Sequence, residues 1–259
     1  MSRTAEQRGP VGAPPDTDVD DPVEPVIDGR RRRWEEHNQA RRQVIIDAAL
    51  VVLERHKPGD EIQVQLIAEE AGLSRTVIYR HFEDRADLDR AVQWRICEQL
   101  WAEMAPALSF ERPPLEIIRS IVDRLVRWAV EHPTLLWFAE RDLSGWGPNP
   151  LGEALERIAE QIEAIMNTVV AYLGVELSPD DRAGLDPWVF GMIGAVISSV
   201  RRWLARPQLE PSVESTVDIL TESIWLQVNG MAASRGLVLP DVPVSELLPG
   251  LLQGEPAGS

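Results

Sequence analysis

The stretch IAEEAGLSRTVIYRHFEDRADL, Ile67 to Leu88, decides the fold of this chain. Two short segments with helical apolar spacing, residues 64–70 and 74–81, are joined by Ala71-Gly-Leu-Ser74. Gly72 suits the left-handed conformation that ends a helix, and Ser74 is a good N-cap for the helix that follows. The spacing therefore predicts a helix-turn-helix.

The second helix of this motif is expected to have distinct inner and outer sides. Ile78 and Phe82 are four residues apart on its inner side. Side chains that can reach base edges and phosphates in a major groove remain on its outer side: Arg75, Thr76, Tyr79 and Arg80. The alternative interpretation is a three-helix packing unit that binds no nucleic acid.

A longer helix is expected to precede the motif. Between residues 41 and 55 the apolar residues recur with the 3-4-3 spacing of one helical face. The tripeptide at residues 57–59, Lys-Pro-Gly, ends the pattern. Together with segments 64–70 and 74–81 this helix completes a three-helix domain.

Residues 40–90 resemble the DNA-binding region of TetR-type transcriptional regulators, because this helix, the Ala-Gly-x-Ser turn, Tyr79-x-His-Phe and Arg85-x-x-Leu occur in the order of that family. The resemblance implies an all-α fold, with an N-terminal helix-turn-helix domain and a larger helical ligand-binding and dimerisation domain. It further implies a homodimer on a palindromic operator in double-stranded DNA, with an affinity that a small apolar effector modulates.

The same resemblance suggests the DNA contacts. Base contacts are expected from Arg75, Thr76, Val77 and Arg80, while Tyr79 and Arg85 correspond to the phosphate-contacting Tyr and Lys of the family. Ser74 is expected to cap the recognition helix and hold a phosphate. The remaining expected contacts are His81, Arg41 and Arg42.

A run of four arginines precedes the first helix: Arg30, Arg31, Arg32 and Arg33. One interpretation is an arm that reaches along the DNA backbone or into a minor groove. The other is a solvated stretch beside an acidic tail.

The charge of the chain is distributed unevenly. The 259 residues carry a formal net charge of −16, to which residues 1–29 contribute −5, residues 30–90 zero and residues 91–259 −11. A phosphate-binding surface needs local positive potential rather than a basic chain. The acidic total is therefore compatible with DNA binding by the neutral segment.

Helical spacing continues through the rest of the chain, and no long alternating run predicts a strand. We expect helices over residues 87–105, 115–130, 134–142, 151–173, 178–205 and 212–229, with a restart near Asp186-Pro187. The predicted organisation is a disordered acidic tail at 1–29, a DNA-binding domain with its arm at 30–86, a ligand-binding and dimerisation domain at 87–235, and a loose tail at 236–259. The alternative for this last segment is that it docks through Leu247, Leu248, Leu251 and Leu252.

Large apolar side chains in the second domain predict either core packing or a ligand cavity, and the resemblance favours the cavity. An elongated lipophilic or acyl-type effector is expected there, and Arg201 and Arg202 either meet an acidic group on it or form a surface pair. The candidate lining residues are Trp94, Trp101, Leu125, Trp128, Phe138, Ile162, Met166 and Phe190.

The last two long helices are expected to form the dimer interface. Small residues that allow close helix approach lie on the first of them, and an apolar stripe lies on the second. The candidates are Gly191, Gly194, Ala195 and Ser198, followed by Leu220, Ile224 and Val228.

Other classes of protein are disfavoured by the motifs. The four histidines lack metal-ligand spacing, and no P-loop, GxGxxG or GxSxG is present. We therefore expect no enzyme, cofactor or metal, with a protein-binding helical adaptor as the remaining rival. Cys97, on an apolar stripe, is expected to be an inert core thiol, and redox sensing through it is the alternative.

No membrane association is expected from the sequence. The longest apolar run, Trp188 to Val200, has 13 residues, which is too few to span a bilayer. The first residues lack the apolar segment of a signal peptide. These features predict a cytoplasmic protein that associates with the nucleoid through DNA.

Overall fold

The computed structural model describes residues 29–109, 111–141, 150–172, 176–239 and 241–247, and within these ranges it is helical with no strand. The all-α prediction is therefore correct. By its contacts the chain divides into two compact units, residues 1–40 and 41–259. The described part of the first unit consists of the opening turns of α1.

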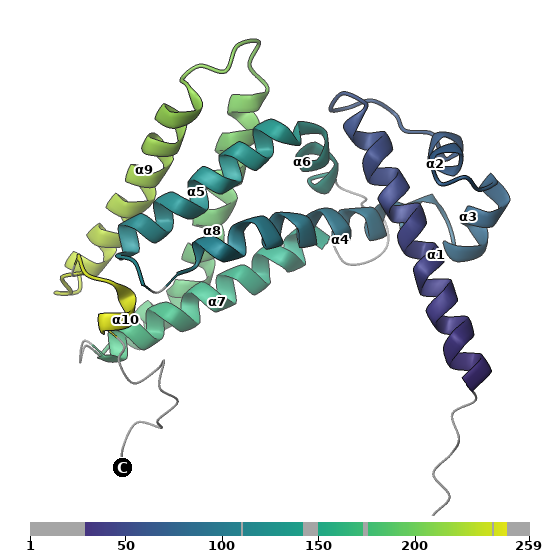
Figure 1. Ribbon diagram of the computed structural model, residues 1–259. Helices are drawn as coiled ribbons and strands as arrows, with labels where there is room; N and C mark the ends of the chain where they lie inside the picture. The colour runs from purple at the N-terminus through teal and green to yellow at the C-terminus, as the bar shows by residue number, and fades with distance from the viewer. Residues whose placement is uncertain (1–28, 110, 142–149, 173–175, 240, 248–259) are drawn as a thin grey trace, which may run out of the picture. The chain divides into compact units, whose positions relative to one another are not determined.

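The DNA-binding motif comprises three helices and leads directly into a fourth (Figure 1). These are α1 (Gly29–Glu54), α2 (Val64–Glu70), α3 (Arg75–His81) and α4 (Arg85–Met104). A short 3-10 turn, η1 (Ala105–Ala107), follows α4. The remaining helices are α5 (Pro114–Glu131), α6 (Pro133–Ala139), α7 (Pro150–Tyr172), α8 (Pro179–Leu204), α9 (Val213–Ala233) and α10 (Val244–Leu247).

The first helix begins at Gly29, well before the expected start at residue 41. Arg30 to Arg33 consequently lie in its first turns and not in an arm that precedes it, which corrects the sequence-based prediction. Residues 30–40 contain mostly Arg, Glu, Gln and Ala, which have high helix propensity, so the helix extends without an apolar face to reveal it. The tail at 1–28 and the side chains of residues 29–36 lie outside the described residues.

Two further expectations at the other end of the chain need correction. α8 runs without a break through Pro187, where a restart was expected. The segment after Arg235 is not loose throughout, because Leu237 and Val244 are buried and the Val244 amide donates to the Arg112 carbonyl at 3.2 Å. Residues 248–259 lie outside the described part of the chain.

A continuous apolar core runs from the DNA-binding motif into the second domain. Ile45 of α1, Ala68 of α2 and Ile78 of α3 are fully buried, and Ile96 of α4 and Val126 of α5 belong to the same cluster. α4 therefore packs against the motif at its start and against the helical domain along its length.

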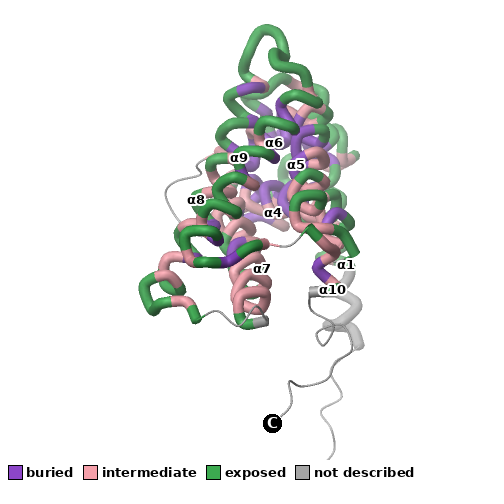
Figure 2. The backbone as a smooth tube through the Cα atoms, turned by 90° about the vertical axis from the view of Figure 1, so that its left-hand side faces the viewer, coloured by how far each residue is buried: buried purple, intermediate pink, exposed green. Residues whose placement is uncertain are grey.

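The helical domain is built from two main packing pairs. α9 packs on α5, and α8 packs on α7, while α4 contacts both α5 and α7. Figure 2 shows that buried residues gather around α4, α5 and α6, that α7 is mostly of intermediate burial, and that the outer turns of α8 and α9 are exposed.

α8 is long enough and apolar enough to cross a membrane on those criteria alone. The 13-residue apolar run that the sequence shows covers only half of this 26-residue helix, so it underestimated the length of the apolar segment. In the structure Val189, Ile197 and Val200 of α8 are buried against the rest of the domain. α8 thus packs on the bundle through one side, and 28% of its most apolar window is buried.

Candidate nucleic-acid interface and ligand cavity

The turn between α2 and α3 has the conformation that its sequence predicts. Gly72 adopts φ +64°, in the left-handed region that favours glycine. The Leu73 amide then donates to the Ala68 carbonyl at 2.8 Å and closes the end of α2. Ile78 and Phe82 are at most 1% exposed, so the inner side of α3 is anchored in the core.

The outer side of α3 presents polar side chains to solvent. Arg75, Thr76, Tyr79 and Arg80 are exposed or nearly so, and Val77 is half-buried. The Arg75 guanidinium lies 5.6 Å from the centroid of the Tyr79 ring. One helix face therefore offers a guanidinium fork, hydroxyl groups and an apolar side chain, which are the groups that read base edges and phosphates.

Ser74 occupies the N-cap position of α3, yet its hydroxyl makes no capping hydrogen bond. The capping role expected for this side chain is therefore wrong, although its position is as expected. Gln63 likewise precedes α2 without a side-chain capping bond, as its poor capping propensity predicts.

Arg42 is committed to the interior of the motif. Its guanidinium lies 4.1 Å from the centroid of Phe82, donates to the His81 carbonyl, and lies 3.7 Å from a carboxylate oxygen of Asp87. These contacts give Arg42 a structural role, and its predicted DNA contact remains a prediction. Arg41 and His81 are half-buried, and their DNA contacts remain predictions.

Arg85 also has a structural role, and its predicted phosphate contact remains a prediction. Its Nε donates to Asp89 Oδ1 at 2.8 Å, and its Nη1 donates to the Ile62 carbonyl in the loop before α2. Asp89 is 4% exposed, and burial raises the pKa of its carboxyl while Arg85 opposes the rise. Arg85 thus ties the start of α4 to the DNA-binding motif.

A cavity of about 600 Å³ lies in the helical domain between α4, α5, α7, α8 and α9. Five of the eight residues proposed from the sequence line it: Trp94, Trp101, Leu125, Ile162 and Met166. Its volume falls within the range of small-molecule sites, and its wall is mostly aliphatic and aromatic.

The other three proposed lining residues lie elsewhere. Trp128 and Phe138 are buried in the core, with the Trp128 ring 5.2 Å from the ring of His132. Phe190 is 39% exposed on the outer side of α8. Aromatic residues are common in both cores and cavities, so residue type alone did not separate the two environments.

Sequence reasoning also missed lining residues. The aliphatic stripes of α5, α7 and α8 supply much of the wall, including Ile118, Ile121, Leu155, Ile158, Met192 and Val196. Their helical periodicity was visible in the sequence and could have identified them. Two charged lining residues, Asp181 and Arg235, had no comparable signal because they are 54 residues apart in the chain.

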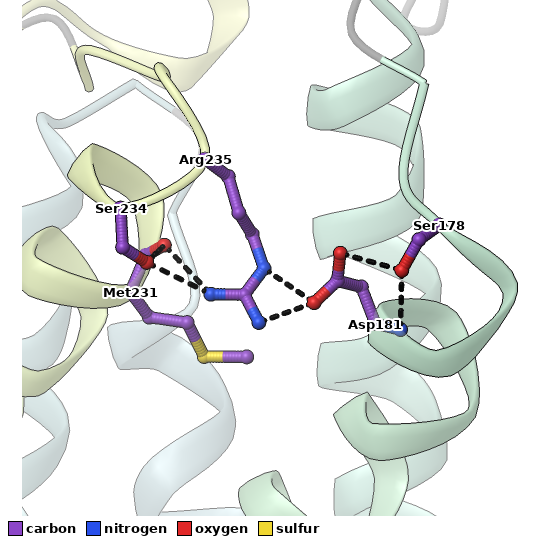
Figure 3. A network of polar contacts seen from close by, with 5 residues as sticks. All are labelled: Ser178, Asp181, Met231, Ser234 and Arg235. Carbon is purple, nitrogen blue, oxygen red and sulfur yellow. Dashed lines mark hydrogen bonds and ion pairs between the residues drawn. The ribbon is translucent and has the colours of Figure 1, made fainter.

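These two residues form a polar network at the cavity wall (Figure 3). Arg235 Nε donates to Asp181 Oδ1 at 2.8 Å, and its Nη1 donates to the Met231 carbonyl and Ser234 Oγ, both at 3.0 Å. The Ser178 hydroxyl donates to Asp181 Oδ2 at 2.7 Å. The hydrogen bond from Ser178 and the contact with Arg235 lower the pKa of the Asp181 carboxyl.

Comparison with known proteins identifies the family. Residues 45–92 match the model of the bacterial regulatory proteins of the tetR family. This match and the relatives below support a TetR-type regulator. This agrees with the exposed α3 and with the resemblance carried by residues 67–88.

Two relatives illustrate how far the similarity of this TetR-family chain extends. It is 28% identical over 210 residues to an HTH-type transcriptional regulator of Mycobacterium tuberculosis, covering 81% of this chain and 86% of the relative. It is 25% identical over 130 residues to the nucleoid occlusion factor SlmA of Vibrio vulnificus, covering 50% of this chain and 66% of that protein.

Solved structures of similar fold cover most of the chain. A TetR-family regulator from Streptomyces coelicolor matches with a TM-score of 0.57 and 22% identity, over 84% of this chain and 90% of its own. RolR, solved in complex with resorcinol, matches with a TM-score of 0.54 and 16% identity, over 87% and 98%. At these identities the matches support the TetR fold and nothing beyond it.

The predicted interface residues face outward on α8 but not on α9. On α8, Gly191 and Ala195 are exposed together with Ser198, and Gly194 is half-buried, so the small residues do face outward. On α9 the predicted stripe of Leu220, Ile224 and Val228 instead packs within the subunit. The prediction for those three residues is therefore wrong.

The exposed apolar residues of α9 form a different stripe. Ile219 is 56% exposed and Leu226 is 62% exposed, and both lie on the outer side of the helix. Sequence periodicity detected an apolar stripe on α9 but did not show which of two stripes faces the core.

Cys97 and the tandem arginines also have defined environments. Cys97 is buried beside the cavity, and burial raises the pKa of its thiol to about 11, which disfavours the reactive thiolate. Arg201 lies 3.5 Å from Glu140 and is not among the cavity-lining residues. Arg202 lines a separate shallow groove with Trp203.

Within the described ranges, no group of three or more His, Cys, Asp or Glu side chains is arranged to hold a metal ion. The family is one of transcriptional regulators, and the Mycobacterium tuberculosis relative is named as one.

Proposed function

We propose that this TetR-family regulator binds a palindromic DNA operator as a homodimer, and that a small apolar effector in the cavity sets its operator affinity. The observation that carries the proposal is the joint presence of an exposed polar α3 face and an apolar cavity that is lined by α4, the helix that follows α3 in the chain.

The operator contacts come from α3. Arg75 and Arg80 address base edges, Thr76 and Val77 meet thymine methyl groups, and the hydroxyls of Ser74 and Tyr79 reach phosphates. The exposure of these side chains supports this assignment. Because the excess acidic charge lies outside residues 30–90, it orients the neutral motif toward DNA.

α4 couples the cavity to α3. Near its start, Arg85 bonds to the Ile62 carbonyl, and Gln93 donates to the carbonyls of Phe138 and Arg141 at 3.0 and 2.9 Å. Farther along, Trp101 and Met104 line the cavity. A ligand that favours one position of α4 therefore favours one position of the recognition helix.

The dimer forms through the outward faces of α8 and α9. Small residues on α8, including Gly191 and Ala195, permit close approach of a second copy, and Ile219 and Leu226 of α9 supply exposed apolar surface. A twofold arrangement presents two α3 helices to successive major grooves about 34–36 Å apart. Such a regulator acts at the nucleoid, in the cytoplasm.

The test is recovery of genomic DNA fragments by the purified full-length protein, followed by sequencing and by fluorescence anisotropy on the enriched site. Enrichment of a palindrome supports the proposal, and absence of any preferred site favours a protein-binding adaptor. Arg75→Ala should cost about 1–3 kcal/mol and relax one base position. Equal weakening on specific and random DNA would recast Arg75 as a phosphate contact.

The ligand arm of the proposal is tested on the same DNA. Apolar ligands are titrated into the complex, and a change in operator affinity is expected for at least one class. If no apolar ligand changes the affinity, the effector role of the cavity fails while DNA binding stands.

A further inference from the structure

Four charged side chains line the described wall of the cavity: Glu98, Arg157, Asp181 and Arg235. The Glu98 and Arg157 side chains are 65% and 67% exposed, so water screens their charges. Asp181 and Arg235 are paired with each other, and their side chains are 28% and 29% exposed. This pair is therefore the less exposed polar site of a mostly apolar cavity.

The cavity is elongated, and the Asp181–Arg235 pair lies toward one end. The lining residues of α7 extend from Leu151 to Val170, a distance of about 29 Å at roughly 1.5 Å per residue. Figure 1 shows that the end of α7, the end of α9 and α10 gather at one end of the helical domain. Arg235 follows α9 at that end.

The negative charge of Asp181 is stabilised by groups other than Arg235. Ser178 Oγ donates to one carboxylate oxygen of Asp181 at 2.7 Å and accepts from the Asp181 amide at 3.0 Å. Asp181 also lies in the first turn of the 26-residue α8, where the helix dipole favours an anion. Asp181 would therefore remain stabilised as an anion without Arg235.

Arg235 has fewer stabilising partners for its charge than Asp181 has. Besides Asp181, Arg235 donates to the Met231 carbonyl and the Ser234 hydroxyl, which are neutral acceptors. The bonds from its Nε and Nη2 both end on a single oxygen, Asp181 Oδ1. A two-oxygen acid fits this guanidinium edge better, because each N–H then has its own acceptor. A cationic ligand would instead face the Arg235 charge.

We propose that Arg235 binds the acidic head group of an elongated amphiphile, such as a straight-chain carboxylate, by exchanging its bonds to Asp181 for bonds to the ligand. The chain of the ligand occupies the apolar length of the cavity. This inference rests on the proposed effector role of the cavity and names the chemical class of the effector. The exchange also releases the start of α8 from the end of α9.

The test measures binding of decanoate, decanol and decylamine to the full-length protein by the fluorescence of its cavity tryptophans. A charge-assisted hydrogen bond predicts that decanoate binds about 10- to 100-fold more tightly than decanol. Arg235→Gln should remove this preference and leave decanol binding nearly unchanged. Arg201→Gln is the matched control, because Arg201 pairs with Glu140 and does not line the cavity, and it should keep the preference.

A second variant tests the exchange itself. Asp181→Asn removes the competing carboxylate and keeps a side chain of the same shape, so decanoate should bind several-fold more tightly than to the wild type. The measurement on Asp181→Asn tests the exchange even if the Arg235→Gln protein is unfolded. Thermal melting of Arg235→Gln shows whether that protein is folded.

The outcomes separate this inference from the proposed function. Equal affinities for decanoate and decanol, a preference for decylamine, or weaker decanoate binding by Asp181→Asn would overturn the role of Arg235 and leave the cavity as an apolar site. Failure of all three probes to bind would count against the effector role itself.

Discussion

The guanidinium of Arg42 lies over the ring of Phe82, 4.1 Å from its centroid, and donates to the carbonyl oxygen of His81. This arrangement joins α1 to the end of the recognition helix α3. An arginine in a motif rich in candidate DNA contacts thus supports the end of that helix. An arginine that supports the fold should affect stability when it is replaced, whereas one that contacts DNA should affect the salt dependence of DNA binding.

Arg42→Ala should destabilise the protein by about 1–3 kcal/mol, because it removes a cation–π contact and a hydrogen bond to a backbone carbonyl. Thermal and urea denaturation measure the change in stability. Arg41→Ala is the control, with an expected change within about 0.5 kcal/mol. A stable Arg42→Ala protein with a reduced salt slope of DNA binding would instead restore the phosphate-contact role.

Arg85→Ala should lower stability and leave the salt dependence of DNA binding unchanged, whereas Arg80→Ala should do the reverse. Removal of Arg85 leaves Asp89 buried without its cation, at a cost of about 1–3 kcal/mol. Adding Asp89→Asn to Arg85→Ala should recover part of the stability, since the amide carries no charge. Denaturation curves and binding isotherms at several salt concentrations provide both measurements.

Leu226→Asp should dissociate the proposed homodimer while the subunit stays folded, because Leu226 is exposed in the isolated chain. Sedimentation velocity measures the change. Ile224→Asp is the contrasting variant: it places a charge in the subunit core and should unfold the protein. A Leu226→Asp protein that remains a dimer would move the interface away from this stripe.

Cys97 should react slowly with a thiol reagent at mildly alkaline pH in the native state and rapidly after unfolding, because the thiolate is the reactive form. Burial raises the native pKa from 9.0 to about 11. Because the native pKa lies above the unfolded value, the Cys97 thiol contributes its full stabilisation below pH 9. This contribution to the free energy of unfolding is lost as the pH rises toward 11. Rapid native-state labelling would show that the thiol is accessible.

Deletion of residues 1–33 tests the arginine cluster in the first turns of α1. If these arginines bind phosphates, the salt slope of DNA binding should fall by about 0.9 for each phosphate that the shortened protein no longer neutralises. Changing only Arg30 to Arg33 to Gln separates their effect from that of the acidic tail. An unchanged slope in both proteins would assign the cluster to solvent.

The local features of the fold were predictable from the sequence. Gly72 has the expected positive φ, Ile78 and Phe82 are on the buried side of α3, and most helices begin near their predicted starts. Such features depend on backbone geometry and on periodicity within one helix, and both are properties of neighbouring residues. Even the family could be recognised from them.

Only the tertiary structure showed which of two apolar stripes on a helix faces the core and which aromatic residues line the cavity. Periodicity showed that α9 has an apolar stripe, but only packing against α5 decided that Ile224 faces inward and Leu226 outward. Residue type likewise left Trp101 and Trp128 indistinguishable, until the bundle placed one at the cavity and the other in the core.

The partners of charged residues were the least predictable feature. Arg42 makes a cation–π contact with Phe82, and Arg85 donates a hydrogen bond to the Ile62 carbonyl. Arg235 donates to Asp181, which lies 54 residues away in the chain. The sequence by itself determined the helices, the turn and the exposed recognition face, because these follow from short-range geometry. Only the tertiary structure decided which arginines support the fold and which remain for DNA or ligand, because long flexible side chains find partners set by the packing of distant helices.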